Sequence, residues 1–218
     1  GRKGTVAVYN YQTGEILCLV SSPSFDPRNI PSGLETDPSY DGVYLNRFLS
    51  STYTPGSTFK LVTSAAALET LHNESSFSYT CSGSLTVNGE KITCPSVHGS
   101  QNFASALANS CNGAFATLAI EVGGETLKSY AESAGLLQSV NVSGLSSATG
   151  SFTAASDKNA LGWSGVGQYE DLVNPCAELT LMGCIAGGGS AATPRLRHPG
   201  GSRLHRHQHH RLEGIHLS

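Results

Sequence analysis

The residues Thr54-Pro55-Gly56-Ser57-Thr58-Phe59-Lys60 lead into a long apolar run. Proline and glycine at its start are typical of a turn. The residues that follow, 58 to 71, carry almost no polar face. A helix that is apolar all round is buried, whereas a surface helix shows a polar stripe. The sequence therefore predicts a buried helix from about Thr58 to Leu71.

Ser57 and Lys60 lie one helical turn apart, so their side chains share a face and can come within hydrogen-bond distance. Unpaired N–H groups at a helix N-terminus favour an alkoxide at Ser57 and the oxyanion that follows its attack. Desolvation lowers the pKa of a lysine amine in an apolar first turn, which makes Lys60 a candidate base. The alternative is a helix-capping serine beside a lysine that reaches solvent.

Ser110-Cys111-Asn112 is a second candidate element. Alternate residues of an extended loop point the same way, so a hydroxyl and a carboxamide would project together. The hydroxyl could relay a proton, and the amide could hold a peptide-like substrate. The alternative is a pair of helix caps, because Ser and Asn are ordinary capping residues.

Composition separates an acidic body from a basic end. The chain has 218 residues, 39% hydrophobic and 13% charged, with a formal net charge of -3, which argues against a nucleic-acid binder. Residues 1–194 contain 8 Lys and Arg and 15 Asp and Glu, whereas residues 195–218 contain 5 Arg, one Glu and six of the eight His. We expect one globular domain over 1–194 and a disordered tail over 195–218.

The remaining elements follow from local patterns. Strand-like runs at 5–9 and 15–20 predict an antiparallel hairpin, and Asn88-Gly89 predicts another within 81–94. Helices are expected at 103–108, 113–122, 125–134 and 175–185. Long loops are expected over 21–55 and 135–167, and the first of them is expected to contain a short helix around 45–49. No apolar run is long enough to span a membrane.

The six cysteines leave one pairing open. A two-residue turn at Asn88-Gly89 would pair Gly83 with Cys94 and place Cys81 diagonally across, so a strained disulfide and two free thiols both remain alternatives. The other cysteines are expected in the core: Cys18, Cys111, Cys176 and Cys184.

These motifs together resemble the penicillin-binding proteins, specifically the D,D-transpeptidase domain of the class B-like enzymes. Residues 54–60 resemble the nucleophile motif of that family with its flanks, and residues 110–112 resemble its second motif. Further similarity lies, in the family's order, at residues 13–17, 21–27, His98-Gly99 and 165–168. The resemblance covers about residues 4–194.

The resemblance implies an α+β fold like that of serine β-lactamases and D,D-transpeptidases, with an antiparallel sheet between helical layers. It implies that Ser57 attacks the D-Ala-D-Ala carbonyl of a peptidoglycan stem peptide and that Lys60 takes its proton. Ser110 would pass a proton to the leaving amine, and Asn112 would bind the substrate amide. A second stem peptide then accepts the acyl group, β-lactams acylate Ser57, and no cofactor is required.

The third motif of the family, Lys-Thr-Gly or Lys-Ser-Gly, is missing. No lysine here precedes Thr-Gly or Ser-Gly, and Lys128-Ser129-Tyr130 falls in a predicted helix. We therefore expect a truncated or frame-shifted domain that lacks the C-terminal strands of the sheet. The hairpin 5–20 would then keep an open edge, the helix 58–71 would lack its cover, and the chain would be marginally stable, impaired in activity or prone to aggregate.

Two other function classes stay open. One is a non-catalytic penicillin-recognition or sensor module, and the less favoured one is a serine β-lactamase, for which no residue that activates the deacylating water can be named. The resemblance implies a place at the extracytoplasmic face of the bacterial membrane, through an anchor outside this chain.

No metal site is expected. His98, before Gly99, is interpreted as a turn or packing residue. The alternative concerns the tail, where imidazoles could bind zinc, nickel or copper through His205, His207, His209 and His210.

Overall fold

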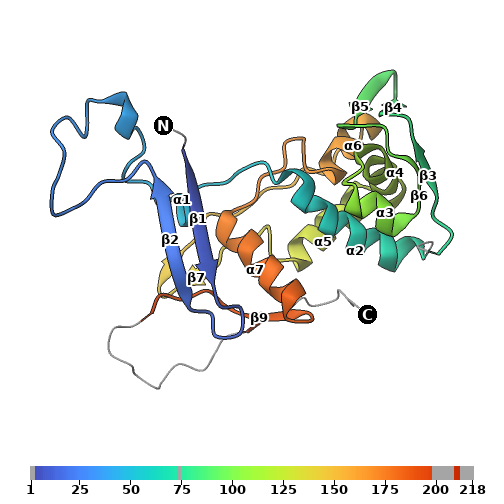
Figure 1. Ribbon diagram of the computed structural model, residues 1–218. Coiled ribbons are helices and arrows are strands. Elements are labelled where there is room, and N and C mark those ends of the chain that lie inside the picture. Colours follow the sequence, from blue (N-terminus) through green and yellow to red (C-terminus); the bar gives the residue numbers. More distant parts are fainter. Residues whose placement is uncertain (1–2, 73–74, 198–208, 212–218) are drawn as a thin grey trace. The chain divides into compact units, whose positions relative to one another are not determined.

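The computed structural model describes residues 3–72, 75–197 and 209–211 (Figure 1). These residues form two compact units. The first unit contains the residues up to Tyr53, Gln138–Thr149 and the described residues from Asn174 onward, and the second contains Thr54–Leu137 and Gly150–Val173. Both units mix helices with short antiparallel strands, so the α+β class is confirmed.

The first unit begins with the predicted hairpin. Strand β1 (Gly4–Tyr9) pairs antiparallel with β2 (Ile16–Ser22). The side chain of Asn10 closes the connection, because its Oδ1 accepts hydrogen bonds from the backbone N–H groups of Gln12 and Thr13. β1 and β2 form a sheet of their own, and every sheet within the described ranges has two strands.

One face of this hairpin is apolar and exposed. Val6 pairs with Val20 and Val8 pairs with Cys18, so these four side chains share a face. Val6 is 64% exposed and Val20 51% exposed. Cys18 is also exposed, so its prediction as a core residue is wrong, because the described part of the unit leaves this face uncovered.

The buried side-chain amide of Asn174 connects two helices of the first unit by hydrogen bonds. Helix α1 (Arg47–Ser50) packs against helix α7 (Pro175–Ala186). Asn174 caps α7 with its Oδ1, and its Nδ2 donates to the carbonyl oxygens of Leu49 and Ser51. Both helices agree with the expected segments.

The first unit also contains part of the C-terminal segment. Its remaining elements are η1 (Pro38–Tyr40), β7 (Asn141–Val142), β8 (Leu145–Ser146), β9 (Ser190–Ala192) and β10 (His209–Arg211). β10 pairs antiparallel with β9, so three tail residues form a strand. Residues 198–208 and 212–218 lie outside the described residues, as do the side chains of the four candidate metal-ligating histidines, so predictions about them stay predictions.

The second unit is mainly helical. Its helices are η2 (Gly56–Phe59), α2 (Lys60–Leu71), α3 (Phe103–Ala108), α4 (Asn112–Val122), α5 (Gly124–Ser133) and α6 (Lys158–Gly165). Helix α2 packs against α4 and α5, and most of its residues are buried. The helix is therefore buried as predicted, and the expectation that it would lack a cover is wrong.

Helix α6 was not predicted, because the sequence over 135–167 is rich in glycine and serine. Asp157 caps this helix. A Cβ at Gly165 would lie 2.1 Å from the Cβ of Ala119, so this glycine lets α6 approach α4 closely. The glycine is a packing residue within a helix and does not mark a loop.

Four short strands complete the second unit: β3 (Tyr79–Cys81), β4 (Ser84–Val87), β5 (Glu90–Thr93) and β6 (Gly99–Gln101). β4 and β5 form the predicted hairpin, with φ of 52° at Asn88 and 84° at Gly89. The N–H of Cys94 donates to the carbonyl of Gly83 at 2.9 Å, which confirms the predicted pairing of these two residues. β3 pairs with β6.

No helix within the described residues is long and apolar enough to cross a lipid bilayer.

Candidate active site

The amine of Lys60, the first residue of α2, lies at the centre of a polar cluster in the second unit. Its Nζ is 3.2 Å from Ser57 Oγ and 2.8 Å from Ser110 Oγ. It also donates to the carbonyl oxygen of Ser110 and to Oδ1 of Asn112, at 2.7 Å each. The structure thus brings together all four residues that were predicted from the sequence as candidate site residues.

Lys60 is almost fully buried, at 1% exposure. The ring of Phe115 lies on one side of the amine, with its centroid 5.8 Å from Nζ. Burial lowers the pKa of the Lys60 ammonium to about 8, and the nearby Cys111 and Cys94 thiols oppose part of this shift. A measurable share of the amine is therefore neutral near neutral pH, as a general base requires.

Ser57 is exposed, and its side chain stands on a tight turn next to this buried amine. The turn is the 3-10 helix η2, which runs directly into α2, so Ser57 precedes the α-helix by one short turn. The N–H of Gly56 donates to the carbonyl of Gly167 at 2.8 Å. Gly167 has a φ of 75°, and a Cβ there would lie 2.2 Å from the carbonyl oxygen of Gly56. The segment 165–168 therefore supports the serine turn by backbone contact.

Ser110 presents two oxygens to Lys60 because its backbone is left-handed, with a φ of 50°. This conformation is uncommon for a residue with a side chain. Backbone hydrogen bonds hold it in place, from the N–H of Ser110 to Leu107 and from the N–H of Cys111 to Ala106, at 2.9 Å each.

Asn112 joins the cluster to strand β5. Its Nδ2 donates to the carbonyl oxygen of Thr93 at 2.7 Å, while its Oδ1 accepts from Lys60. A carboxamide has two N–H donors and two acceptor lone pairs, so one of each stays available for a peptide-like ligand. Asn112 is the first residue of α4 and does not cap it, since the N-cap is Cys111.

The capping alternatives for the serines are wrong as well. The N-cap positions of η2 and α2 are Pro55 and Phe59, and no side-chain capping hydrogen bond forms at η2, α2 or α4. The polar side chains of Ser57, Ser110 and Asn112 face Lys60 and do not cap these helices. The arrangement can pass a proton from one hydroxyl to the amine and from the amine to the other hydroxyl.

Sequence reasoning missed a second cluster beside the Ser110 loop. All six cysteines are free, so the alternative of a Cys81–Cys94 disulfide is not realised. The Sγ of Cys94 lies 3.8 Å from that of Cys111, and Cys81 and His98 lie close to both. The interpretation of His98 as a turn or packing residue therefore did not include the three neighbouring thiols. The sequence signal is weak because the members come from four separate elements.

The predicted burial of Cys111, Cys176 and Cys184 is confirmed.

Comparison with protein families gives a match to the penicillin binding protein transpeptidase domain over residues 4–212. Peptidoglycan D,D-transpeptidase PbpA of Mycobacterium tuberculosis strain H37Rv is 32% identical over 212 residues, which cover 89% of this chain and 43% of PbpA. The chain therefore spans less than half the length of this curated relative.

Solved structures of penicillin-binding proteins and transpeptidase domains also resemble this chain. The imipenem acyl-enzyme complex of penicillin-binding protein A from M. tuberculosis has a TM-score of 0.80 at 30% identity, covering 96% of this chain and 53% of that one. The D,D-transpeptidase domain of a peptidoglycan glycosyltransferase from Eggerthella lenta has a TM-score of 0.78 at 25% identity, covering 89% of this chain and 52% of that one. The described fold thus corresponds to about half of each solved chain.

Proposed function

This chain belongs to the penicillin-binding protein transpeptidase domain family, and we propose that Ser57 forms an acyl-enzyme with the D-Ala-D-Ala end of peptidoglycan stem peptides. One observation carries the proposal. The Nζ of Lys60 lies within hydrogen-bond distance of both Ser57 Oγ and Ser110 Oγ.

The first step is the attack of Ser57. The neutral amine of Lys60 takes the hydroxyl proton as Oγ bonds to the carbonyl carbon of the penultimate D-Ala. The carbonyl π electrons move to oxygen, and a tetrahedral oxyanion forms. The N–H of Gly56 is already bonded to the carbonyl of Gly167. We therefore assign the stabilisation of this oxyanion to the N–H of Ser57 in the first turn of η2, because donors at a helix N-terminus stabilise developing negative charge.

The second step breaks the peptide bond. As the oxyanion collapses, the C–N bond cleaves and Ser110 Oγ gives its proton to the departing amine of the terminal D-Ala. Lys60 then passes to Ser110 Oγ, across the 2.8 Å contact, the proton that it took from Ser57. Proton and charge balance without a metal or a cofactor. Asn112 orients the stem peptide through its remaining donor and acceptor.

The third step resolves the acyl-enzyme. The amine of a second stem peptide attacks the ester carbonyl and gives up one proton through Ser110 to Lys60. The Ser57 oxygen leaves and takes that proton from Lys60, and a cross-link forms. A β-lactam follows the first two steps, in which its ring C–N bond is cleaved, and then stays as the acyl-enzyme, because the ring nitrogen remains tethered to the acyl group and cannot leave. Solved relatives are acyl-enzyme complexes with imipenem and with penicillin G.

Within these 218 residues no lysine precedes Thr-Gly or Ser-Gly, the third motif of the family. We therefore expect the chain tested alone to bind the substrate carboxylate weakly and to turn over slowly. Its substrate is peptidoglycan, so we place the working enzyme at the extracytoplasmic face of the bacterial membrane.

The test is the release of D-Ala from a synthetic stem pentapeptide, with an amine acceptor present, measured by mass spectrometry. Ser57→Ala should abolish release, and the exposed Ser82→Ala is the matched control that should retain it. A sensor module would give the acyl-enzyme without the transferred product. Release that survives Ser57→Ala would overturn the assignment.

A further inference from the structure

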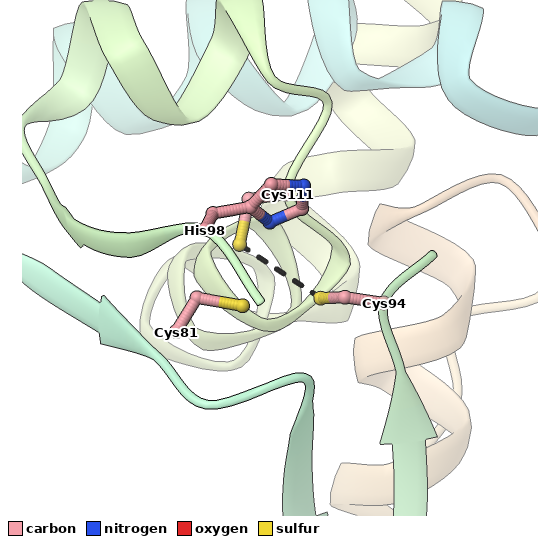
Figure 2. Close-up of side chains that lie close together, drawn as sticks. All are labelled: Cys81, Cys94, His98 and Cys111. Carbon is pink, nitrogen blue, oxygen red and sulfur yellow. Dashed lines mark hydrogen bonds between the residues drawn. The ribbon is translucent and has the colours of Figure 1, made fainter. Parts of the chain in front are cut away.

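Four side chains with metal-binding atoms meet in the second unit, apart from the residues that carry out the proposed acyl transfer. They are Cys81, Cys94, His98 and Cys111, and their ligand atoms all lie within 4.8 Å of one another. Figure 2 shows the three sulfur atoms and the imidazole ring gathered around one space. Two of the four residues are buried and the other two are half-buried.

The spacing of two sulfur atoms matches a tetrahedral metal centre. A Zn–S bond of about 2.3 Å places two sulfur ligands of a tetrahedral ion about 3.8 Å apart. The Sγ atoms of Cys94 and Cys111 lie 3.8 Å apart. A disulfide would need about 2.05 Å, and both residues are free thiols.

His98 supplies an independent observation. Its Nδ1 is buried and has no hydrogen-bond partner among the residues that the structure describes. Figure 2 shows one ring nitrogen of His98 directed toward the sulfur atoms. A buried imidazole nitrogen without a partner is unfavourable, and coordination to a metal ion would satisfy it.

Each of the four residues lies at or next to the end of a helix or strand. Cys81 ends β3, Cys94 follows β5, His98 precedes β6, and Cys111 is the N-cap of α4. The N–H of Gly113 donates to the Sγ of Cys94 at 3.3 Å. Such N–H···S contacts orient a thiolate ligand in metal sites.

From this geometry we infer that Cys81, Cys94, His98 and Cys111 form a Cys₃His site that binds Zn²⁺. Three thiolates and one imidazole are the donor set of a structural zinc centre, and they select against Mg²⁺ and Ca²⁺, which prefer oxygen ligands. Four protein ligands leave no open position for a reacting water, so the ion stabilises structure and does not take part in the chemistry.

The site also reaches the catalytic loop, an argument that rests on the proposed function. Cys111 lies between Ser110 and Asn112. Cys94 follows Thr93, whose carbonyl accepts the hydrogen bond from Asn112 at 2.7 Å. A bound zinc ion would join the end of β5 to this loop and hold both polar residues beside Lys60. Its ligands are therefore positioning residues.

The test must separate this site from the histidine-rich tail, which can bind metal by itself. The full chain is prepared without a metal-affinity column, with four tail substitutions as the background: His205→Gln, His207→Gln, His209→Gln and His210→Gln. Bound zinc is measured by elemental mass spectrometry. Zinc is then exchanged for Co²⁺, whose thiolate charge-transfer and tetrahedral d–d bands report sulfur ligands directly.

We expect a single zinc ion per background chain and a tetrahedral cobalt–thiolate spectrum. Cys94→Ser should lose the ion, whereas Cys18→Ser, which removes an exposed thiol elsewhere, should keep it. Because the cobalt spectrum is recorded on the background chain, the test holds even where Cys94→Ser fails to fold. A folded background chain that contains no zinc and shows no cobalt–thiolate bands would overturn the proposal. An intact mass lower than the calculated mass by two hydrogens, which indicates a disulfide, would also overturn it.

Acylation then tests the positioning role separately. Removal of zinc with a chelator should slow penicillin acylation of Ser57 several-fold, and added Zn²⁺ should restore the rate. An unchanged rate after verified zinc loss would overturn the positioning role. Zinc content is read without any acylation, so a failure of the proposed acyl-transfer activity would not be mistaken for a failure of the metal site.

Discussion

The Nζ of Lys60 lies 2.8 Å from the hydroxyl and 2.7 Å from the carbonyl oxygen of Ser110, a residue 50 positions further along the chain. Both contacts depend on the left-handed backbone of Ser110. A buried amine between two serine hydroxyls, only one of them exposed, gives each hydroxyl a distinct place in a proton relay.

Replacement of Lys60 by arginine should slow acylation strongly although the positive charge is kept. A guanidinium stays protonated and cannot accept the Ser57 proton, so we expect the penicillin acylation rate to fall by roughly 100-fold or more. Stopped-flow measurement with a fluorescent penicillin reports the rate. Lys158→Arg, at the exposed start of α6, is the matched control. A Lys60→Arg chain that acylates at the parent rate would remove Lys60 as the base.

The acylation rate should rise with pH. Burial lowers the pKa of Lys60 to about 8, and the neutral amine is the active form, so the rate should increase through that value and level off above it. Rates measured from pH 6 to pH 9.5 on a chain shown to stay folded check the profile. A rate that is flat across this window is incompatible with Lys60 as the titrating base.

Asp171 should make the protein less stable as pH rises. Burial raises the pKa of this carboxyl to about 7, the nearby charge of Glu170 adds to the shift, and the hydrogen bond from Ser164 opposes it. The folded state therefore binds a proton more tightly than the unfolded state, in which the pKa is 3.8. The resulting stability is complete below about pH 4 and is lost as pH rises toward 7.

The substitution Asp171→Asn tests this linkage. It keeps an acceptor for Ser164 and removes the titration. We expect the free energy of unfolding to exceed that of the parent by roughly 1–3 kcal/mol at pH 7.5, with no gain at pH 4. Denaturant unfolding at the two pH values measures the difference. A gain of equal size at both pH values would show that the charge is not the cause.

The close approach of α6 to α4 predicts a cost for one methyl group. Gly165→Ala would place a Cβ 2.1 Å from that of Ala119, so the helices must separate. We expect a loss of about 1–3 kcal/mol in the free energy of unfolding. Gly4→Ala, where a Cβ meets nothing within 4 Å, should leave stability almost unchanged. Equal stability of the parent and Gly165→Ala chains would contradict the packing account.

The exposed face of β1 and β2 predicts self-association. Val6 and Val20 are paired across the strands and exposed, and an uncovered apolar sheet face favours aggregation. Light scattering should show concentration-dependent association of the parent chain, reduced in a Val6→Thr, Val20→Thr double variant. A parent chain that stays monomeric at every concentration would contradict the predicted self-association.

Local sequence signals predicted much of the fold. Asn88-Gly89 fixed one hairpin, because both residues tolerate the positive φ that the turn needs. Helix α2 was predicted from its lack of a polar face, and its burial followed. Helix α6 was missed because Gly165 lies in a glycine- and serine-rich segment of the kind that is typical of loops. In the structure this glycine is a packing residue. Only its distance to Ala119, across the fold, tells the two apart.

In the candidate site, too, contacts between near neighbours in the sequence could be predicted and contacts between distant segments could not. Ser57 and Lys60 could be paired from sequence because three-residue spacing places them on one helix face. Ser110 and Asn112 were connected to them only by family resemblance, since nothing in the sequence places residue 110 beside residue 60. The cysteine and histidine cluster was not predicted, because the spacing of its members follows no short metal-binding motif.

The central claim is that Ser57 is the nucleophile of this chain. Intact-mass spectrometry after incubation with penicillin G tests it most directly, with the parent and Ser57→Ala chains side by side. We predict a penicilloyl adduct of the full penicillin mass on the parent and none on Ser57→Ala, with peptide mapping that places the adduct at Ser57. An adduct on both chains, or no adduct on a parent chain shown to be folded, would contradict the claim.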